Sequence, residues 1–398
     1  MSWPIPTLRS FDSVKPPRLW LWVLLLLVFL LVGAILTLTL WPVNSPAHGL
    51  RFWIALVGCP LLGWTASLGI RLLAYGNECE ARALLNGERE VLINQWHGWG
   101  DRRLAVLAAA VVTPDGDSVR PVPASEGPKI NPEFHPESRR QIGTINTDGQ
   151  PDARRDELLN RLLYQIGGAL TQVRCGIEIA APAVTSIERL DASPRASQLL
   201  EAMSDKRIRT RALDAGTDLS PSGLFARWAD EQSAYCGLVV ATQLWGDDGV
   251  PSFTEAGAAL ILASVGVVNT TGVEPIAWLY RPMPTNFAGL TEDLKAMFRS
   301  QGKLPDSSTW WLSGMKQPSI EKLFSELSLS EEIRGESGRN VEPVSLDMFI
   351  GSPGALREWI ALGAACKAAL QTETTQFCAT ELESDFTLAR VAAPGEMT

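Results

Sequence analysis

Histidine is scarce in this chain, and its cysteines are unpaired. The 398 residues include three histidines, His48, His97 and His135, and six cysteines. No two cysteines form a C-x-x-C pair, and no group of cysteines and histidines has the spacing of a zinc site. The sequence therefore offers no ligand set for a metal, indicates no cofactor, and predicts free thiols in a reducing compartment.

Charge is absent from two long stretches near the amino terminus. Residues 19–41 and 52–70 contain no charged side chain, and about 20 apolar residues are enough for a helix to cross the hydrocarbon core of a bilayer. The segment between them is rich in proline and glycine, which favours a turn. The sequence therefore predicts a transmembrane helical hairpin in the lipid bilayer over residues 19–75, with the second helix at 52–75.

Basic residues are distributed unevenly around the predicted hairpin. Arg9, Lys15 and Arg18 precede the first helix, whereas the connecting segment offers only Arg51 at its end. Positive charge marks the cytoplasmic side of a membrane protein. We therefore expect a two-pass protein of the bacterial inner membrane, with the short lead of residues 1–18 and everything after the hairpin in the cytoplasm.

Positive charge is also in deficit over the rest of the chain. The net charge is −9, and because residues 1–75 are themselves basic, the acidity lies in residues 76–398. An acidic domain lacks the electrostatic footprint of a nucleic-acid-binding protein, and anionic lipid repels it. We therefore expect no nucleic-acid partner.

Residues 76–398 alternate apolar runs typical of strands with segments of helical spacing. Strands are predicted at 103–114, 237–244, 275–280 and 386–392, with shorter ones at 90–96 and 141–145. Helices are predicted at 77–87, 157–172, 290–301, 319–327 and 352–370. Periodicity leaves residues 256–265 open between strand and helix, and the composition of 115–152 indicates a long surface loop. Strands that alternate with helices indicate an α/β architecture.

Several stretches resemble, in order, the β-ketoacyl synthases of the thiolase superfamily. The matching segments are RRLAVLAAAVVTPDG at 102–116, FTEAGAALILAS at 253–264, the helix–strand–helix run at 290–323, and the glycine-rich start and long helix at 351–370. The resemblance implies a degenerate thiolase-like layered domain over residues 76–398. Its amino half is expected at about 90–236 and its carboxyl half at about 237–398.

The family's catalytic groups are missing from the matching positions. Family members use a cysteine at a strand–helix elbow and two histidines, but here Ser313 to Gln317 and Gly351–Ser352 occupy the histidine positions. No histidine follows His135, and neither Cys175 nor Cys236 is followed by the small-residue turn of an elbow. The resemblance therefore implies a protein that is not an enzyme.

A surface rather than a reaction is then the expected basis of function. The WHGW stretch and the turn after the predicted strand at 310–313 depart from the family and carry aromatic side chains, which dominate interface energetics. The candidate partner-binding residues are Trp96, His97, Trp99, Trp310, Trp311, Met315 and Lys316. Side chains alternate along a strand, so one of the adjacent tryptophans is expected in the core and the other at the surface. The alternative is that all the tryptophans are core residues and that the histidine is structural.

The resemblance favours a membrane-anchored, catalytically inactive adaptor or accessory protein that binds a partner protein. Proteins of this kind occur beside type VI secretion effectors. Two other functions stay open. An acyl- or lipid-modifying enzyme at the membrane would require a nucleophile that the sequence does not visibly supply, and a membrane-anchored immunity protein would bind one toxin tightly.

Overall fold

The structure is a computed structural model of the whole chain. The residues that it describes are 3–4, 6, 9–42, 49–117, 140–143, 145, 151–173, 176–180, 210–212, 219–230, 235–245, 253–330, 333, 340–352, 354–382 and 385–397. Contacts divide the chain into two compact units, of which one is Pro6–Trp96 and the other joins Met1–Ile5 to His97–Thr398. The expected loop at 115–152 and Cys175 lie largely or wholly outside the described residues.

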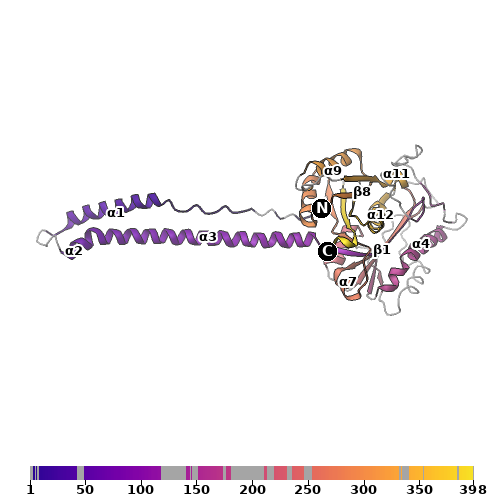
Figure 1. The fold of residues 1–398 in the computed structure, drawn as a ribbon, viewed down its shortest axis with the longest axis horizontal. Helices are drawn as coiled ribbons and strands as arrows, with labels where there is room; N and C mark the ends of the chain where they lie inside the picture. The colour runs from indigo at the N-terminus through magenta and orange to yellow at the C-terminus, as the bar shows by residue number, and fades with distance from the viewer. Residues whose placement is uncertain are drawn as a thin grey trace. The chain divides into compact units, whose positions relative to one another are not determined.

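The first unit is built from apolar helices (Figure 1). They are α1 (Leu19–Leu40), the short α2 (Leu50–Trp53), the π-helical turn η1 (Ile54–Gly58) and α3 (Cys59–Gly100). The two long helices have the length and composition needed to cross a membrane. α1 packs on the following helix through Gly33, which has no side chain where the Pro60 ring approaches. The Trp64 indole also donates to the Trp22 carbonyl at 2.8 Å.

Helix α3 runs without a break through the segment for which the sequence predicts a short helix and a strand. Residues 77–87 lie in its middle, and residues 90–96 are helical, so the predicted strand is wrong. The alternation in EVLINQW is too short to outweigh a helix that already extends through Glu90, because propagation adds one hydrogen bond for each residue fixed.

The second unit is organised around one mixed sheet. Its order is β3-β2-β4-β5-β1-β6-β11-β10-β8-β9, and β7 pairs with β11 in addition. The strands are β1 (Arg103–Val112), β2 (Gly176–Ala180), β3 (Thr210–Ala212), β4 (Tyr235–Gln243), β5 (Ala256–Ser264), β6 (Ala277–Tyr280), β7 (Met283–Asn286), β8 (Ser307–Ser313), β9 (Asn340–Ser345), β10 (Gln376–Leu382) and β11 (Asp385–Ala392).

The sheet consists of two halves with the same internal plan. In the first half β3, β2 and β4 are parallel, followed by antiparallel β5 and β1. In the second half β9, β8 and β10 are parallel, followed by antiparallel β11 and β6. β1 and β6 join the halves as an antiparallel pair, with Arg103 opposite Tyr280. The halves therefore meet in the chain between β5 and β6, not at residues 236–237, because β4 and β5 pair with strands of the first half.

Helices cover both faces of this sheet. They are α4 (Pro151–Gln172), α6 (Pro221–Asp230), α7 (Val265–Thr271), α8 (Leu290–Gln301), α9 (Gln317–Leu329), α11 (Leu346–Ile350) and α12 (Arg357–Thr372), with 3₁₀ turns η4 (Gly354–Leu356) and η5 (Pro394–Met397). α4 belongs to one buried cluster, and α6 and α12 belong to the other. α12 contacts strands of both halves, which explains its small residues: at Gly363 the Val111 side chain occupies the space of a β-carbon.

Most sequence predictions for this unit agree with the structure. The strands expected at 103–114, 237–244, 275–280 and 386–392 correspond to β1, β4, β6 and β11, and the open segment 256–265 is mainly strand β5. The strand expected at 141–145 is wrong. Its described residues form a turn in which Ile142 N donates to the buried Glu255 carboxylate at 2.9 Å and Ile145 N donates to the Ile142 carbonyl.

Candidate functional site

The WHGW stretch lies at the carboxyl end of α3, where the chain enters the second unit. His97 Nδ1 lies 3.3 Å from the Ser300 hydroxyl. The Gln301 amide donates to the Gly100 carbonyl at 3.2 Å and to the Arg281 carbonyl at 2.8 Å. The first of these bonds satisfies the Gly100 carbonyl, which has no partner within the helix because it lies at the end of α3. Trp96 is half-buried and belongs to the first unit, so the four residues of the stretch do not form one continuous surface of the second unit.

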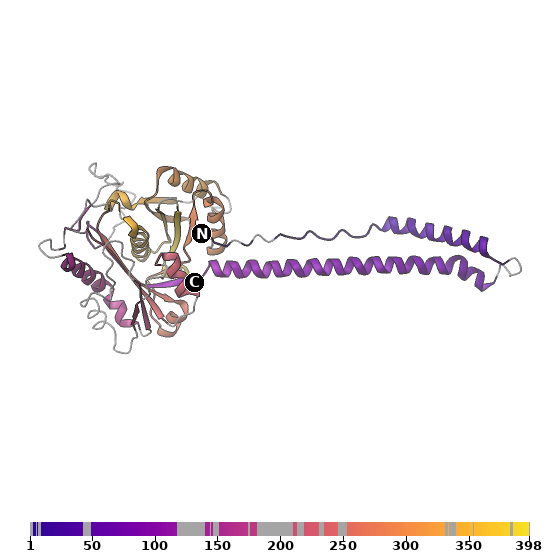
Figure 2. The ribbon, with the colours of Figure 1, turned by 180° about the vertical axis from the view of Figure 1, so that it is seen from behind.

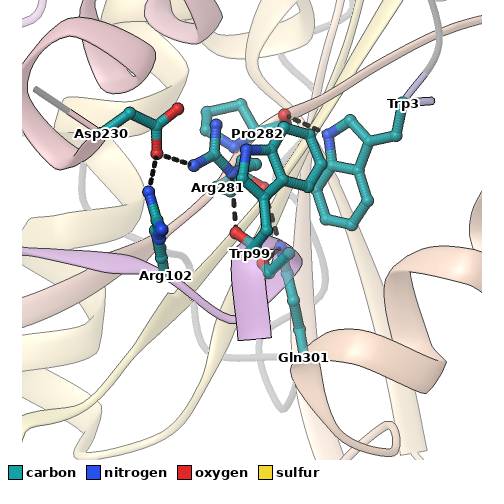
Figure 3. Close-up of polar contacts among 8 residues, drawn as sticks. Trp3, Trp99, Arg102, Asp230, Arg281, Pro282 and Gln301 are labelled. Atoms are coloured by element: carbon teal, nitrogen blue, oxygen red, sulfur yellow. Dashed lines mark hydrogen bonds and ion pairs between the residues drawn. The ribbon is translucent and has the colours of Figure 1, made fainter. Parts of the chain in front are cut away.

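Arg281 is the centre of the contacts around Trp99 (Figure 3). Its guanidinium lies 3.9 Å from the centroid of the Trp99 ring, and its Nε donates to the Trp99 carbonyl at 3.0 Å. Its Nη2 pairs with Asp230, which also accepts from Arg102 at 2.6 Å. Burial lowers the pKa of Arg281, and the hydrogen bond to Asp230 opposes that effect. Desolvation strengthens both the ion pair and the cation–π contact, so this residue fixes the tryptophan.

Trp3, from the amino-terminal segment, completes this arrangement. Its indole Nε1 donates to the Pro282 carbonyl at 3.0 Å, its ring meets the Trp99 ring edge-on at 5.4 Å between centroids, and only 4% of it is exposed. A β-carbon at Gly100 would lie 2.9 Å from the Trp3 ring and 2.8 Å from Ser300. We name Trp3, Trp99, Arg281 and Asp230 the tryptophan–arginine cluster. Trp99 is therefore engaged within the molecule.

The adjacent tryptophans of β8 are both core residues, so the prediction that one of them faces solvent is wrong. Trp310 and Trp311 have 0% exposure. Trp310 stacks on Phe377 with 4.6 Å between ring centroids, and the Trp311 indole donates to the Gln376 side chain at 3.1 Å. Side chains of a strand do alternate, but β8 lies inside a sheet that packs on both faces, as strands of α/β folds commonly do.

The turn from β8 to α9 contains the remaining candidates, Met315 and Lys316. Met315 is half-buried, and the Lys316 side chain is 70% exposed. The Lys316 backbone N–H donates to Glu381 at 2.9 Å, and its ammonium lies 3.7 Å from the same carboxylate. Gly314 has φ of +69° and the Arg357 side chain beside it, so no other residue fits there without strain. Lys316 is thus the most exposed of the seven candidate residues.

A half-buried carboxylate holds the base of this turn. Asp347 accepts from the Ser313 hydroxyl and from the Gly314 N–H, each at 2.7 Å. Burial raises the pKa of Asp347, while these two bonds and the charge of Arg357 oppose the rise. Arg357 also donates to the Gly354 carbonyl at 2.7 Å and to the Glu381 carbonyl. The polar groups of the turn are therefore paired with one another.

The described thiols of this unit lie in the core. Burial raises the pKa of Cys366 to about 12, and burial together with Cys366 raises the pKa of Cys378. Cys236 is also buried. A nucleophilic cysteine needs a lowered pKa and access to solvent, so these positions do not fit one. Within the described ranges, no three histidine, cysteine or acidic side chains come together as metal ligands.

Sequence reasoning found Lys316 through its departure from a family motif, but it missed Trp3, Arg281, Asp347 and Glu381. The contacts of these residues join segments far apart in the chain, and no local spacing marks them. A weak signal existed at Trp3, which is the one aromatic residue among the first ten.

Comparisons with known proteins identify the fold. No protein-family model matches the chain, and no curated protein matches it. A chain from the complex of a type II PKS acyl-carrier protein with its ketosynthase superposes with a TM-score of 0.51 and 11% identity, covering 74% of this chain and 99% of that one. An oxazolomycin ketosynthase domain from Streptomyces albus gives a TM-score of 0.48, 13% identity and coverage of 74% and 96%. A variant of Xanthomonas campestris OleA superposes with a TM-score of 0.44 and 10% identity, covering 73% of this chain and 98% of that one.

The first of these superpositions shows that the second unit has a thiolase-like α/β fold of the ketosynthase type. Its two half-sheets of equal plan are consistent with that assignment. At this level of identity the likeness concerns the fold alone.

Proposed function

We propose that this protein is a membrane-anchored, catalytically inactive thiolase-like adaptor that binds a partner protein. The proposal places α1 and the apolar segment at residues 52–75, which includes the first part of α3, across the bacterial inner membrane, with the amino terminus and the thiolase-like unit in the cytoplasm. The partner class suggested by the sequence resemblance is a type VI secretion effector. Orientation follows from Arg9, Lys15 and Arg18, which precede α1.

The β8–α9 turn is the observation that carries the proposal. The resemblance aligns this turn with a catalytic histidine loop, but here Ser313 and Gly314 donate to the half-buried Asp347. No histidine occurs in the sequence after His135. A proton-transferring or oxyanion-binding group has to present free donors to the reacting atom, and the described groups of this turn are engaged with each other. A fold kept without its reactive groups is best explained by binding.

The exposed part of the same turn is the proposed binding surface. Lys316 projects into solvent, with Gln317 and Pro318 exposed beside it, and Asp347 and Glu381 fix the backbone beneath it. A rigid support lowers the entropy lost when a partner binds. An exposed cation on such a support suits an acidic region of the partner.

Capture of proteins from native membranes tests this surface. The full-length chain, solubilised in detergent, should retain a specific protein that Lys316→Glu retains several-fold less well. Lys303→Glu makes the same charge change at another exposed lysine and serves as the matched control. Equal loss with both variants, or no loss with either, would remove the turn from the proposal.

Orientation is tested by accessibility. Gly49→Cys in the connection between α1 and α2 should react with a membrane-impermeant thiol reagent in intact spheroplasts, above the background of the native thiols. Lys303→Cys should react only after lysis. The reverse pattern would place the thiolase-like unit in the periplasm.

A further inference from the structure

The part of α3 that follows its apolar run has two unlike faces. One face is a half-buried stripe at alternating spacings of three and four residues, made of Tyr75, Cys79, Arg82, Asn86, Arg89, Ile93 and Trp96. The extended chain before α1 runs beside α3 (Figures 1 and 2). The Asn86 amide bonds both backbone groups of Phe11, at 3.1 and 3.0 Å, and Arg82 donates to the Asp12 carbonyl at 2.8 Å. The amino-terminal segment therefore occupies this face.

The other face is apolar and bare. Leu84, Leu85, Val91 and Leu92 are 64%, 46%, 54% and 50% exposed. Leu84 and Val91 are seven residues apart, as are Leu85 and Leu92, and the exposed positions between and beside them complete one stripe along the helix. Apolar side chains repeated at this spacing are typical of a helix that packs against another helix. We name residues 81–95 on this face the bare stripe.

The exposed charged side chains of this part of α3 are of one sign. Glu78, Glu80, Glu88 and Glu90 are all exposed, whereas the two arginines of this segment lie on the covered face. Arg82 is paired with Glu78 at 2.7 Å. Glu88 lies within the stripe and Glu80 lies beside its start, so the stripe is acidic, and anionic lipid would repel it. Four glutamates also exclude this segment from the hydrocarbon core.

The same charges disfavour a second copy of the chain. If α3 crosses the membrane, two copies in one membrane present their helices in parallel and in register. Glu88, in the middle of the stripe, would then face its own counterpart, and like charges at such a contact are destabilising. Apolar positions with Glu88 among them and Glu80 beside them suit instead a helix that carries leucine-like residues on one face and Lys or Arg beside them.

We propose that the bare stripe binds a basic amphipathic helix of a partner protein. The surface lies on the first unit, separate from the β8–α9 turn, so this proposal stands or falls independently of that turn. Leu85 and Leu92 are the central apolar contacts, and Glu88 between them pairs with a basic side chain of the partner.

A designed peptide pair tests the recognition chemistry directly. The full-length protein in phosphatidylcholine nanodiscs is titrated with a labelled helical peptide that has leucines at the core positions and lysines beside them. A second peptide keeps the leucines and has glutamates in place of the lysines. Fluorescence anisotropy should detect binding of the lysine peptide only, and Glu88→Lys should reverse the preference. Equal binding of both peptides, or of neither, would overturn the proposal.

Two variants distinguish binding at the bare stripe from general electrostatic attraction between the basic peptide and an acidic protein. Leu92→Glu should lower the affinity for the lysine peptide about tenfold or more, as loss of a central contact does. Ala83→Glu adds the same charge at an exposed position outside the stripe and should leave affinity within about twofold. If both variants strengthen binding, the attraction is electrostatic alone and the stripe is not the site.

A photoreactive residue in place of Leu92 tests the surface in cells. Capture of a protein whose crosslinked peptide is a basic amphipathic helix supports the proposal. Crosslinks to a second copy of the chain or to lipid would overturn it. Circular dichroism should show equal helix content for every variant, because the substituted side chains are exposed.

Discussion

Trp99 and Trp311 have similar sequence contexts, each with another tryptophan nearby, but their surroundings differ. Trp311 lies on β8, which pairs with a strand on each side, with 0% exposure and its indole bonded to Gln376. Trp99 lies at the end of a helix and is held by Arg281 and by Trp3, which is 96 residues earlier in the sequence. An aromatic residue in an unusual motif therefore indicates a contact, but the tertiary fold decides whether that contact belongs to the core, to a closing cluster or to a partner.

Truncation of the core tryptophan should have the largest effect. Trp311→Ala removes a buried ring and leaves Gln376 without its donor, so we expect about 3–5 kcal/mol of lost stability. Trp311→Phe keeps most of the ring volume and should cost less. Thermal unfolding of the detergent-solubilised variants measures both. A stable Trp311→Ala protein that has lost partner capture would contradict the core assignment and restore this residue to an interface.

Removal of the Arg281 guanidinium from the tryptophan–arginine cluster should have a smaller effect on stability. Arg281→Ala loses the contact with Trp99 and one of the two partners of Asp230, and should cost roughly 2 kcal/mol. The cost stays below that of a fully broken buried pair, because Arg102 still pairs with Asp230. Arg281→Lys keeps the charge and should recover part of the loss in the same unfolding assay. No difference between the variants would show that the planar guanidinium contributes nothing here.

Trp3 should contribute less again, because its side chain makes one ring contact and one hydrogen bond in the cluster and no ion pair. Trp3→Ala loses an edge-on ring contact and one hydrogen bond, and should destabilise the second unit by about 1–2 kcal/mol. Trp3→Phe keeps an aromatic ring without the donor and should fall between the two. An unchanged unfolding temperature in Trp3→Ala would mean that this tryptophan does not support the cluster.

The smallest expected effect is the contribution of Asp347 to the pH dependence of stability. Because burial raises its pKa in the folded state, the folded protein binds this proton more tightly than the unfolded chain does. Stability from this group is therefore greatest below the ordinary pKa of about 3.9 and decreases as pH rises through the higher folded value.

Asp347→Asn cannot ionise, so its unfolding free energy should change less with pH across that window. Some slope should remain, since the pKa of Asp101 and that of Asp293 are also raised by burial. Chemical denaturation at a series of pH values measures the slopes. Equal slopes in wild type and variant would show that Asp347 is not the titrating group.

The comparison also shows what the sequence can and cannot predict. A continuous apolar run predicts β1, and helical spacing predicts α8. Both signals exist because the faces that an element buries determine where its apolar residues recur in the sequence. β10 was not predicted, since its Gln376, Thr380 and Glu381 make it look polar. Two of these side chains are paired in the core, Gln376 with Trp311 and Glu381 with the Lys316 backbone. Such pairs arise between distant segments and leave no local pattern.

The central proposal is that this chain keeps a thiolase-like fold without the chemistry of the family that it resembles, and incubation of the full-length protein with acyl-CoA tests this proposal most directly. Intact-mass spectrometry should find no acyl adduct on any cysteine or serine, while a catalytically active ketosynthase treated in parallel should be acylated. A stoichiometric acyl group on Cys175, on Cys236 or on a serine of this chain would contradict the account.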